Sequence, residues 1–445
     1  MMMKGLILQL CILTGTLFTT SAQQVKKIKM ADTVDASTKL YSLSTLWKET
    51  SYNFVWFDKQ PKLNWDSVYQ SYIPKVLKAA NVFELNRVLT KFLEELKDGH
   101  TAVWTNQGFW DEIDQPPLSM VRFEGKLLVL KLDFKLKEKV PIKSEILKIN
   151  GREAQEFLEN DSWLGFKETE VKLVYKKPAG DIDSVTLKRN LNTLHKQGGF
   201  SYFPVALNTA APKFKHSVLP EKISLIQINT FADPAVVDSF KQVLPQLKQA
   251  KALIIDLRNN GGGNSDYALE IAKLITDQPY LVGPSWKTRI HHAANKAWGS
   301  FNKLSSKSEN YAFKEYIEMD AWESHHGDTV IANLTGDRLN KPVILLTSKN
   351  TYSAAEDFLI YLLKSKNIVR IGQASAGSSG QPLRIQLPLG MTARICAKRD
   401  ALPDGKDYIG KGILPNIEIP EKPLFSSLSE DVELKSAIDY LLKKR

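Results

Sequence analysis

The amino-acid sequence predicts an α/β fold, and two observations carry this prediction. Residues 222–420 alternate apolar strands, such as Ile223 to Ile228 and Ala252 to Leu257, with helices, an order typical of a sheet covered by helices. The chain of 445 residues is also too long for one core, because single cores stop growing beyond about 250–300 residues. We therefore expect an α/β core at residues 200–425, further domains before it and a C-terminal helix at 429–445.

Residues 38–110 have the pattern of a helical N-terminal domain. Apolar side chains recur at helical spacing from Val76 to Leu96, and an aromatic cluster lies between Trp47 and Trp65. The helical pattern ends at Asp98-Gly99-His100-Thr101, where the glycine is a helix stop signal.

Residues 115–192 predict a small β-rich domain. Runs such as Lys126 to Leu132 and Val171 to Tyr175 have strand composition, and Ile149-Asn150-Gly151 reads as a strand that enters a tight turn. Within the core, residues 283–337 show no clear period and are expected to be an irregular stretch.

Residues 1–22 have the features of a signal peptide. Lys4 supplies a positive start, Gly5 to Phe18 is apolar but too short to cross a bilayer, and Thr20-Ser21-Ala22 offers small residues for cleavage. We expect export to the periplasm, the cell surface or the medium. No later stretch is long and apolar enough to be a membrane helix. After signal removal Cys396 is the only cysteine left, which excludes an intrachain disulfide.

The charge distribution argues against a nucleic-acid partner. The formal net charge is +11, but the Lys and Arg residues are scattered, without a long basic run. Nucleic-acid binding is typical of basic residues clustered on one face or along one helix. We interpret these side chains as solvated surface.

A glycine-rich loop follows the buried strand at Ala252 to Leu257. The segment Asn259-Asn260-Gly261-Gly262-Gly263 can turn tightly and direct backbone N–H groups into a cavity, where they can bind a phosphate or an oxyanion. The loop lacks the Gly-Lys-Ser/Thr of a phosphate loop and the spacing of a dinucleotide fingerprint. It is equally consistent with a plain strand-to-helix turn.

A second motif, Ser353-Ala354-Ala355-Glu356, follows the apolar strand Val343 to Thr347. Ser353 opens a helix, and its hydroxyl would lie at the positive end of the helix dipole together with the N–H of Ala354. Ser-x-x-Glu is also the pattern of a capping box. Residue chemistry alone favours the cap, although a capping serine and a nucleophile can be the same residue.

A nucleophilic serine needs a base, and His100 is the histidine with a motif around it. Taken alone it fits a surface turn as well as it fits a general base. The adjacent pairs His291-His292 and His325-His326 lie in the irregular stretch, and neighbouring side chains need not converge on one metal. We therefore expect no metal site and no organic cofactor.

The order of these motifs resembles the C-terminal-processing and tricorn-core serine peptidase family. The order is Asp98-Gly99-His100-Thr101, the β-rich module, the loop from Asp256 to Gly263, Ser353-Ala354-Ala355-Glu356, and the ending Gly410 to Ile417. The resemblance implies a crotonase/ClpP-like αβ core and a helical N-terminal domain. It also implies that the β-rich module is PDZ-like, since Lys143 to Arg152 is similar to the Ile-x-x-Ile-Asn-Gly stretch of such domains.

The resemblance also implies catalytic roles. Ser353 falls on the nucleophile, and the N–H groups of Ala354 and Gly262 fall on the oxyanion hole. One branch of the family uses a lysine beyond the serine, but the matching segment here has Ser378 in that place. The tricorn-like branch instead uses a histidine from the N-terminal region, which His100 matches.

That branch also has a late carboxylate that helps to orient the histidine. The residue at the expected glutamate position is Ile409 here, Asp407 is the nearest substitute, and Asp404 lies behind it. A carboxylate that only orients the imidazole changes the rate without abolishing the chemistry. The expected catalytic residues are therefore Ser353, His100 and Asp407.

The function implied is that of an exported serine-type endopeptidase acting on peptides or unfolded proteins. The alternative is a non-catalytic relative of the fold that binds a hydrophobic ligand or peptide, since a missing lysine and a displaced carboxylate mark such drift. A scaffold acting only through its PDZ-like module would leave Ser353 and the glycine loop unexplained.

Overall fold

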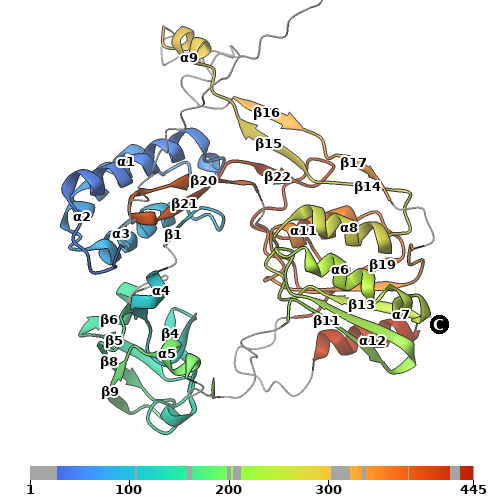
Figure 1. Ribbon diagram of the computed structural model, residues 1–445, viewed down its shortest axis with the longest axis horizontal. Coiled ribbons are helices and arrows are strands. Elements are labelled where there is room, and N and C mark those ends of the chain that lie inside the picture. Colours follow the sequence, from blue (N-terminus) through green and yellow to red (C-terminus); the bar gives the residue numbers. More distant parts are fainter. Residues whose placement is uncertain are drawn as a thin grey trace, which may run out of the picture.

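The computed structural model describes residues 28–105, 108–157, 163–197, 202–203, 212–301, 321–332, 337–378, 380–420 and 431–443 (Figure 1). The predicted signal peptide at residues 1–22 lies outside these ranges. Within the described ranges, no helix combines the length and the apolar character needed to cross a lipid bilayer.

A six-stranded sheet forms the centre of the C-terminal half and confirms the expected α/β fold. In spatial order its strands are β11 (Phe214–Leu219), β12 (Ile223–Ile228), β13 (Ala252–Asp256), β18 (Val343–Thr347), β19 (Ile368–Gly372) and β23 (Ile417–Glu418). Strand β11 is antiparallel to β12, and the other neighbouring pairs are parallel. Every residue of β13 and β18 is buried, which explains their continuous apolar runs.

Helices cover both faces of this sheet. One face packs against α6 (Ala235–Gln242), α7 (Leu244–Gln249), α8 (Ser265–Ile275) and α11 (Ala354–Tyr361) in one apolar cluster. The C-terminal helix α12 (Val432–Lys443) packs on the other face against β18 and β19. Asn264 caps α8 by accepting a hydrogen bond from the Asp266 N–H, so the glycine loop after β13 leads directly into a helix.

Three helices form the N-terminal region, where the helical periodicity lies in the sequence. They are α1 (Ala36–Asn53), α2 (Trp65–Lys78) and α3 (Val82–Glu94), followed by the short helix α4 (Phe109–Glu112). Asp35, Asn64 and Asn81 cap the three longer helices by accepting hydrogen bonds from first-turn N–H groups.

Strands from the late part of the chain complete this helical region. Strand β21 (Thr392–Cys396) lies between β1 (Ala102–Trp104) and β20 (Pro382–Gln386) in a three-stranded antiparallel sheet. Strands β20 and β21 lie beside α1, α2 and α3 (Figure 1), and their apolar side chains belong to the same buried cluster as those helices. The helical region therefore shares its core with residues that lie far along the sequence.

The β-rich module is a separate sheet, seen at the lower left of Figure 1. Its path runs β10 (Tyr202–Phe203), β4 (Lys126–Asp133), β5 (Glu145–Ile149), β8 (Glu170–Lys176) and β9 (Ile182–Lys188). Strand β3 (Leu118–Phe123) pairs with β4, and β6 (Arg152–Glu153) pairs with β5. The pair β2 (Ile113–Asp114) and β7 (Gly165–Phe166) and the helix α5 (Leu191–Lys196) complete it.

The expectation of an irregular stretch at residues 283–337 is wrong for the described part of it. Strand β14 (Tyr280–Val282) pairs with β17 (Thr329–Ile331), and β15 (Ser285–Arg289) lies between β16 (Trp322–His325) and β22 (Arg399–Ala401). These strands lead away from the central sheet towards helix α9 (Ala293–Gly299) (Figure 1). The side chains of β16 are partly or largely exposed, so no buried face imposes an apolar alternation on its sequence.

Candidate active site

The loops that follow β13 and β18 are joined at the carboxyl end of the central sheet. The Tyr352 N–H donates to the Asn260 carbonyl at 3.0 Å, and the Ser348 hydroxyl donates to the Arg258 carbonyl at 2.6 Å. In open α/β sheets, ligands bind at this end of the strands. The two motifs singled out in the sequence, the glycine loop and Ser353, therefore lie together.

Ser353 has an unusual backbone conformation. Its φ is 55° and its ψ is −124°, and α11 begins at the next residue. A strained backbone of this kind costs on the order of 1–3 kcal/mol and concentrates at functional sites. The Ser353 N–H lies 3.2 Å from both the Glu356 carboxylate and the Ser378 carbonyl, which hold the residue in place.

Gly262 lies directly against the serine. Its φ is 90°, and a Cβ at this position would lie 2.8 Å from the Ser353 Cβ and 2.6 Å from the Tyr352 carbonyl oxygen. Only glycine fits here. The Gly262 N–H donates to the Asn260 side chain at 2.9 Å, so in this structure that predicted oxyanion donor is directed at another group.

The other predicted oxyanion donor is Ala354. It is the first residue of α11 and is buried beside Ser353. An N–H group in the first turn of a helix has no intrahelical acceptor. It also adds to the positive potential at the N-terminus of α11, which favours a developing negative charge.

Glu356 is a buried carboxylate that joins the serine to the loop after β19. It accepts hydrogen bonds from the Ser375 hydroxyl at 2.6 Å and from the N–H groups of Gly377 at 2.8 Å and Ser378 at 3.0 Å. Burial raises its pKa to about 7 against the opposing effect of these bonds. The capping-box pattern predicted a Glu356 bond to the Ser353 N–H but gave no sign of the other three donors.

His100 lies in the turn before β1 and is held by two hydroxyl groups. Its Nδ1 is 2.9 Å from the Ser378 Oγ and 3.1 Å from the Tyr352 Oη. Its ring stacks on Tyr352 with centroids 4.8 Å apart and planes 17° apart. Burial lowers the pKa of His100 to about 4, and the nearby charge of Arg394 acts in the same direction.

Within the described ranges, no hydrogen bond joins His100 to Ser353, and the Nε2 atom of His100 is buried without a hydrogen-bond partner. Ser378 nevertheless contacts both residues, because its carbonyl accepts from the Ser353 N–H and its hydroxyl meets Nδ1. Sequence reasoning noted Ser378 only as the residue in the lysine's place. The place of Ser378 at the lysine position was the one feature of the sequence that pointed to this contact.

The two candidate carboxylates make other contacts. Asp407 pairs with Lys59 at 2.8 Å and with Arg399 at 3.4 Å. Asp404 pairs with Lys406 at 2.8 Å. Neither carboxylate forms a hydrogen bond with His100 in the described part of the chain.

The remaining histidines of the sequence motifs lie on the arm formed by β15, β16 and α9. His291 contacts the Tyr52 carbonyl, and His325 pairs with Glu323 at 2.7 Å. Among the residues with described positions, no three His, Cys, Asp or Glu side chains gather as a metal would require.

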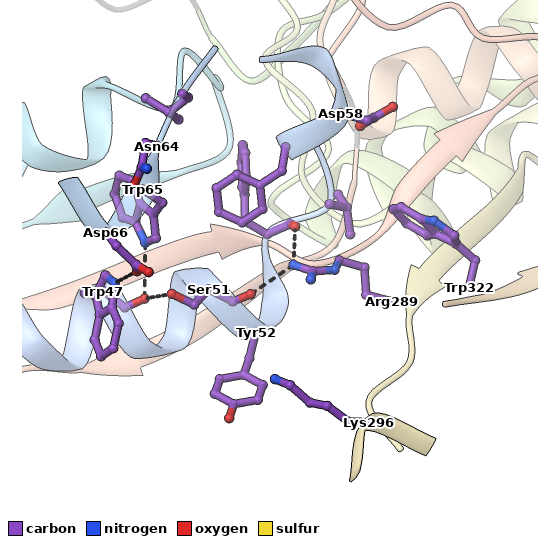
Figure 2. A pocket seen from close by; sticks show the side chains of 14 residues that line it. Trp47, Ser51, Tyr52, Asp58, Asn64, Trp65, Asp66, Arg289, Lys296 and Trp322 are labelled. Carbon is purple, nitrogen blue, oxygen red and sulfur yellow. Dashed lines mark hydrogen bonds between the residues drawn. The ribbon is translucent and has the colours of Figure 1, made fainter. Parts of the chain in front are cut away.

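An aromatic cavity of about 750 Å³ lies between the helical region and the arm (Figure 2). Trp47, Trp65 and Trp322 line it, and none of the predicted site residues does. The Arg289 guanidinium inside it donates to the carbonyls of Ser51 and Phe54 at the end of α1. This arginine thus satisfies orphan carbonyls of a helix C-terminus.

Comparison with known proteins shows which family and relatives this chain is similar to. Residues 222–419 match the family described as Peptidase family S41. The Carboxyl-terminal-processing protease of Picosynechococcus sp. is 22% identical over 306 residues, which are 68% of this chain and 63% of the relative. The Carboxy-terminal processing protease CtpA of Bacillus subtilis is 24% identical over 314 residues, which are 67% of this chain and 54% of the relative. The chain thus spans 63% and 54% of the length of these relatives.

Solved structures show the same fold. Mature CPAF complexed with lactacystin has a TM-score of 0.59 at 16% identity, with 92% of this chain and 97% of that chain covered. A putative peptidase from Parabacteroides merdae has a TM-score of 0.51 at 18% identity, with 92% of this chain and 97% of that chain covered. The solved structures support the fold, and the family match and the two relatives make this chain similar to serine-type peptidases. Residues 222–419 match peptidase family S41, and C-terminal-processing proteases are among the relatives of this chain.

Proposed function

We propose that this protein is an exported serine-type endopeptidase that hydrolyses peptide bonds through an acyl-enzyme on Ser353, with His100 as the general base. The observation that carries the proposal is the conformation of Ser353. A serine with φ of 55° at the start of α11, packed against a glycine that no other residue can replace, is a strained arrangement of the kind that concentrates at functional sites.

The proposed mechanism uses groups already described. His100 is neutral at physiological pH because burial lowers its pKa to about 4. Its Nε2 can therefore accept the Ser353 proton once a hydrogen bond forms between the two side chains, as catalytic hydrogen bonds often do only in the substrate complex. The serine Oγ then attacks the peptide carbonyl, and the Ala354 N–H and the glycine loop stabilise the oxyanion. One such donor typically contributes about 10²–10³ in rate. His100 returns the proton to the leaving amine, and water releases the acyl group.

Use of the Gly262 N–H requires a small change. This N–H now donates to Asn260, and it would have to exchange that bond for one to the oxyanion. Hydrogen bonds used in catalysis often tighten only in the substrate complex. The role of Asp407 as the third catalytic residue stays a prediction.

Further parts of the proposal rest on the sequence. Export rests on the signal-like residues 1–22. The assignment of the β-rich module as PDZ-like rests on the motifs quoted above, and that of the core as crotonase/ClpP-like rests on those motifs and on the S41 match at residues 222–419. The expected substrate is a peptide or an unfolded protein.

The test combines a fluorophosphonate probe with a mixed peptide library, applied to the mature protein and to Ser353→Ala. We expect the wild type to be labelled and to cleave, and Ser353→Ala to do neither. A wild type that neither labels nor cleaves would favour the non-catalytic binder of hydrophobic ligands or peptides. Labelling that survives in Ser353→Ala would place the nucleophile elsewhere.

A further inference from the structure

We propose that Ser378 and Tyr352 are positioning residues that hold His100 through Nδ1, in the place that a carboxylate occupies in a Ser–His–carboxylate triad. The inference deepens the proposed function, and its kinetic consequence rests on that function. It assigns a role to the residue that stands where the Ser–Lys branch has its lysine.

The contacts fix the ring of His100 in two ways. Stacking on Tyr352 sets the plane of the imidazole, and the two hydroxyl groups at 2.9 and 3.1 Å from Nδ1 set its rotation. A residue with a Cβ at position 99 would lie 2.6 Å from the Tyr352 Oη. Gly99 therefore allows the turn to bring His100 this close.

Ser378 is itself held firmly, which a positioning residue requires. Its N–H donates to the buried Glu356 carboxylate at 3.0 Å, and its carbonyl accepts from the Ser353 N–H at 3.2 Å. The same residue therefore contacts the backbone of the nucleophile and the ring of the base. A shift of Ser378 would change the geometry between the two.

The tautomer of His100 follows in this proposal from the contact between the two hydroxyl groups. The Ser378 hydroxyl donates its one proton to the Tyr352 Oη at 2.9 Å. With that proton committed, an Nδ1–H completes the 2.9 Å contact with the Ser378 Oγ, whereas an unprotonated Nδ1 could accept from Tyr352 alone. The proposed tautomer therefore has the ring proton on Nδ1 and leaves the Nε2 lone pair for the proton of Ser353.

A hydroxyl group enforces this tautomer less strictly than a carboxylate does. An ionised carboxylate only accepts hydrogen bonds, whereas a hydroxyl can also donate. If Ser378 or Tyr352 donated to Nδ1 instead, the ring proton would move to Nε2 and His100 could not act as a base. Replacing Ser378 by an acceptor-only side chain should therefore improve the base.

Other charged and titratable groups lie near the His100 ring, and the test must keep them unchanged. Arg394 and Cys396 lie on β21, Asp98 lies in the same turn as His100, and Glu356 lies on α11 beside Tyr352. All four are kept in every variant, so a change in the titration of His100 comes from position 378 or 352.

The experiment measures imidazole ¹⁵N chemical shifts of His100 and the rate of fluorophosphonate labelling across pH, in the full mature chain. In the wild type we expect the Nδ1–H tautomer. Ser378→Ala should mix the tautomers and slow labelling about tenfold or more, because it removes an orienting contact of a general base. Tyr352→Phe should act in the same direction, and Ser378→Thr should restore the wild-type tautomer.

Ser378→Asp provides the sharpest arm. It should lock the Nδ1–H tautomer and raise the pKa of His100 by about 1 to 3 units through the adjacent negative charge. The acid limb of the labelling profile should move to higher pH by the same amount. A residue with only a structural role would not shift this limb. Ser375→Ala, which loosens the same loop without touching Nδ1, should leave the tautomer unchanged.

Two results separate the proposals. A wild type that is not labelled at all would overturn the proposed function, while the nitrogen shifts would still report the tautomer. His100 shifts and pKa that are the same in the wild type, Ser378→Ala and Ser378→Asp would overturn this inference. Circular dichroism on each variant checks that the chain is folded.

Discussion

Three residues of the site each have an energetically unfavourable conformation or environment, which their neighbours stabilise. They are Ser353, Glu356 and His100. Ser353 has a strained backbone, Glu356 is a fully buried carboxylate, and His100 is a partly buried base with a lowered pKa. Perturbed groups of this kind gather at functional sites. The residue types were recognisable in the sequence, but their perturbation was not, because burial depends on which distant segments cover them.

The lowered pKa of His100 predicts activity in mildly acidic solution. Catalysis needs the neutral imidazole, and a histidine with an ordinary pKa would be only about 3% neutral at pH 5. With a pKa of about 4, His100 stays mostly neutral there. We expect the rate of Ser353 labelling to change little between pH 7 and pH 5 through His100, and to fall by half near pH 4.

Glu356 is a second titratable group beside Ser353, so the pH profile of labelling needs a control variant for it. Its pKa of about 7 could add its own dependence near neutrality. The variant Glu356→Gln removes that titration while the limb near pH 4 should remain. A midpoint near pH 6.5 in both proteins would contradict the lowered pKa of His100.

Among the elements, the two strand–loop–helix units of the site were the part that the sequence predicted best. Strands β13 and β18 are buried on both faces, so their apolar runs are continuous and easily recognised. The contacts between the two loops were not predictable, because they join Asn260 to Tyr352 across a long stretch of chain. The arm at β15 and β16 was missed because its half-exposed strands have no buried face.

Replacement of Gly262 tests the fit between these loops. In Gly262→Ala the new Cβ would lie 2.6 Å from the Tyr352 carbonyl oxygen, at a φ of 90° that side chains disfavour. We expect a loss of about 1–3 kcal/mol in the free energy of unfolding in urea. Labelling of Ser353 should fall by about 10²–10³, because displacement of the loop also displaces the proposed oxyanion donor.

Gly261→Ala is the matched stability control. A Cβ at Gly261 meets no atom within 4 Å. Its free energy of unfolding should stay within about 0.5 kcal/mol of the wild type, as is usual for substitutions away from packed or strained positions. Equal destabilisation by the two substitutions would show that the close packing of Gly262 on Ser353 does not constrain this position.

For the molecule as a whole, the site depends on two cores that are interleaved in sequence. Ser353 lies between strand β18 of the central sheet and helix α11, whereas His100 leads into β1, which pairs with β21 from the late part of the chain. Sequence periodicity predicted the helices α1 to α3 and the core as consecutive units. It could not show that β20 and β21 cross into the helical region, since short strands carry no mark of their partners.

This crossing predicts that a substitution near the end of the chain loosens the N-terminal helices. Ile395 on β21 is fully buried in the cluster that contains α1, α2 and α3. Ile395→Ala should cost about 2–5 kcal/mol in stability and speed amide hydrogen exchange in those helices. Labelling of Ser353 should also slow, because β21 holds the strand that follows His100.

Ile254→Ala, an equally buried change in β13, is the control and should instead speed amide hydrogen exchange in the central sheet. Unchanged exchange in α1 to α3 of Ile395→Ala would contradict the shared core.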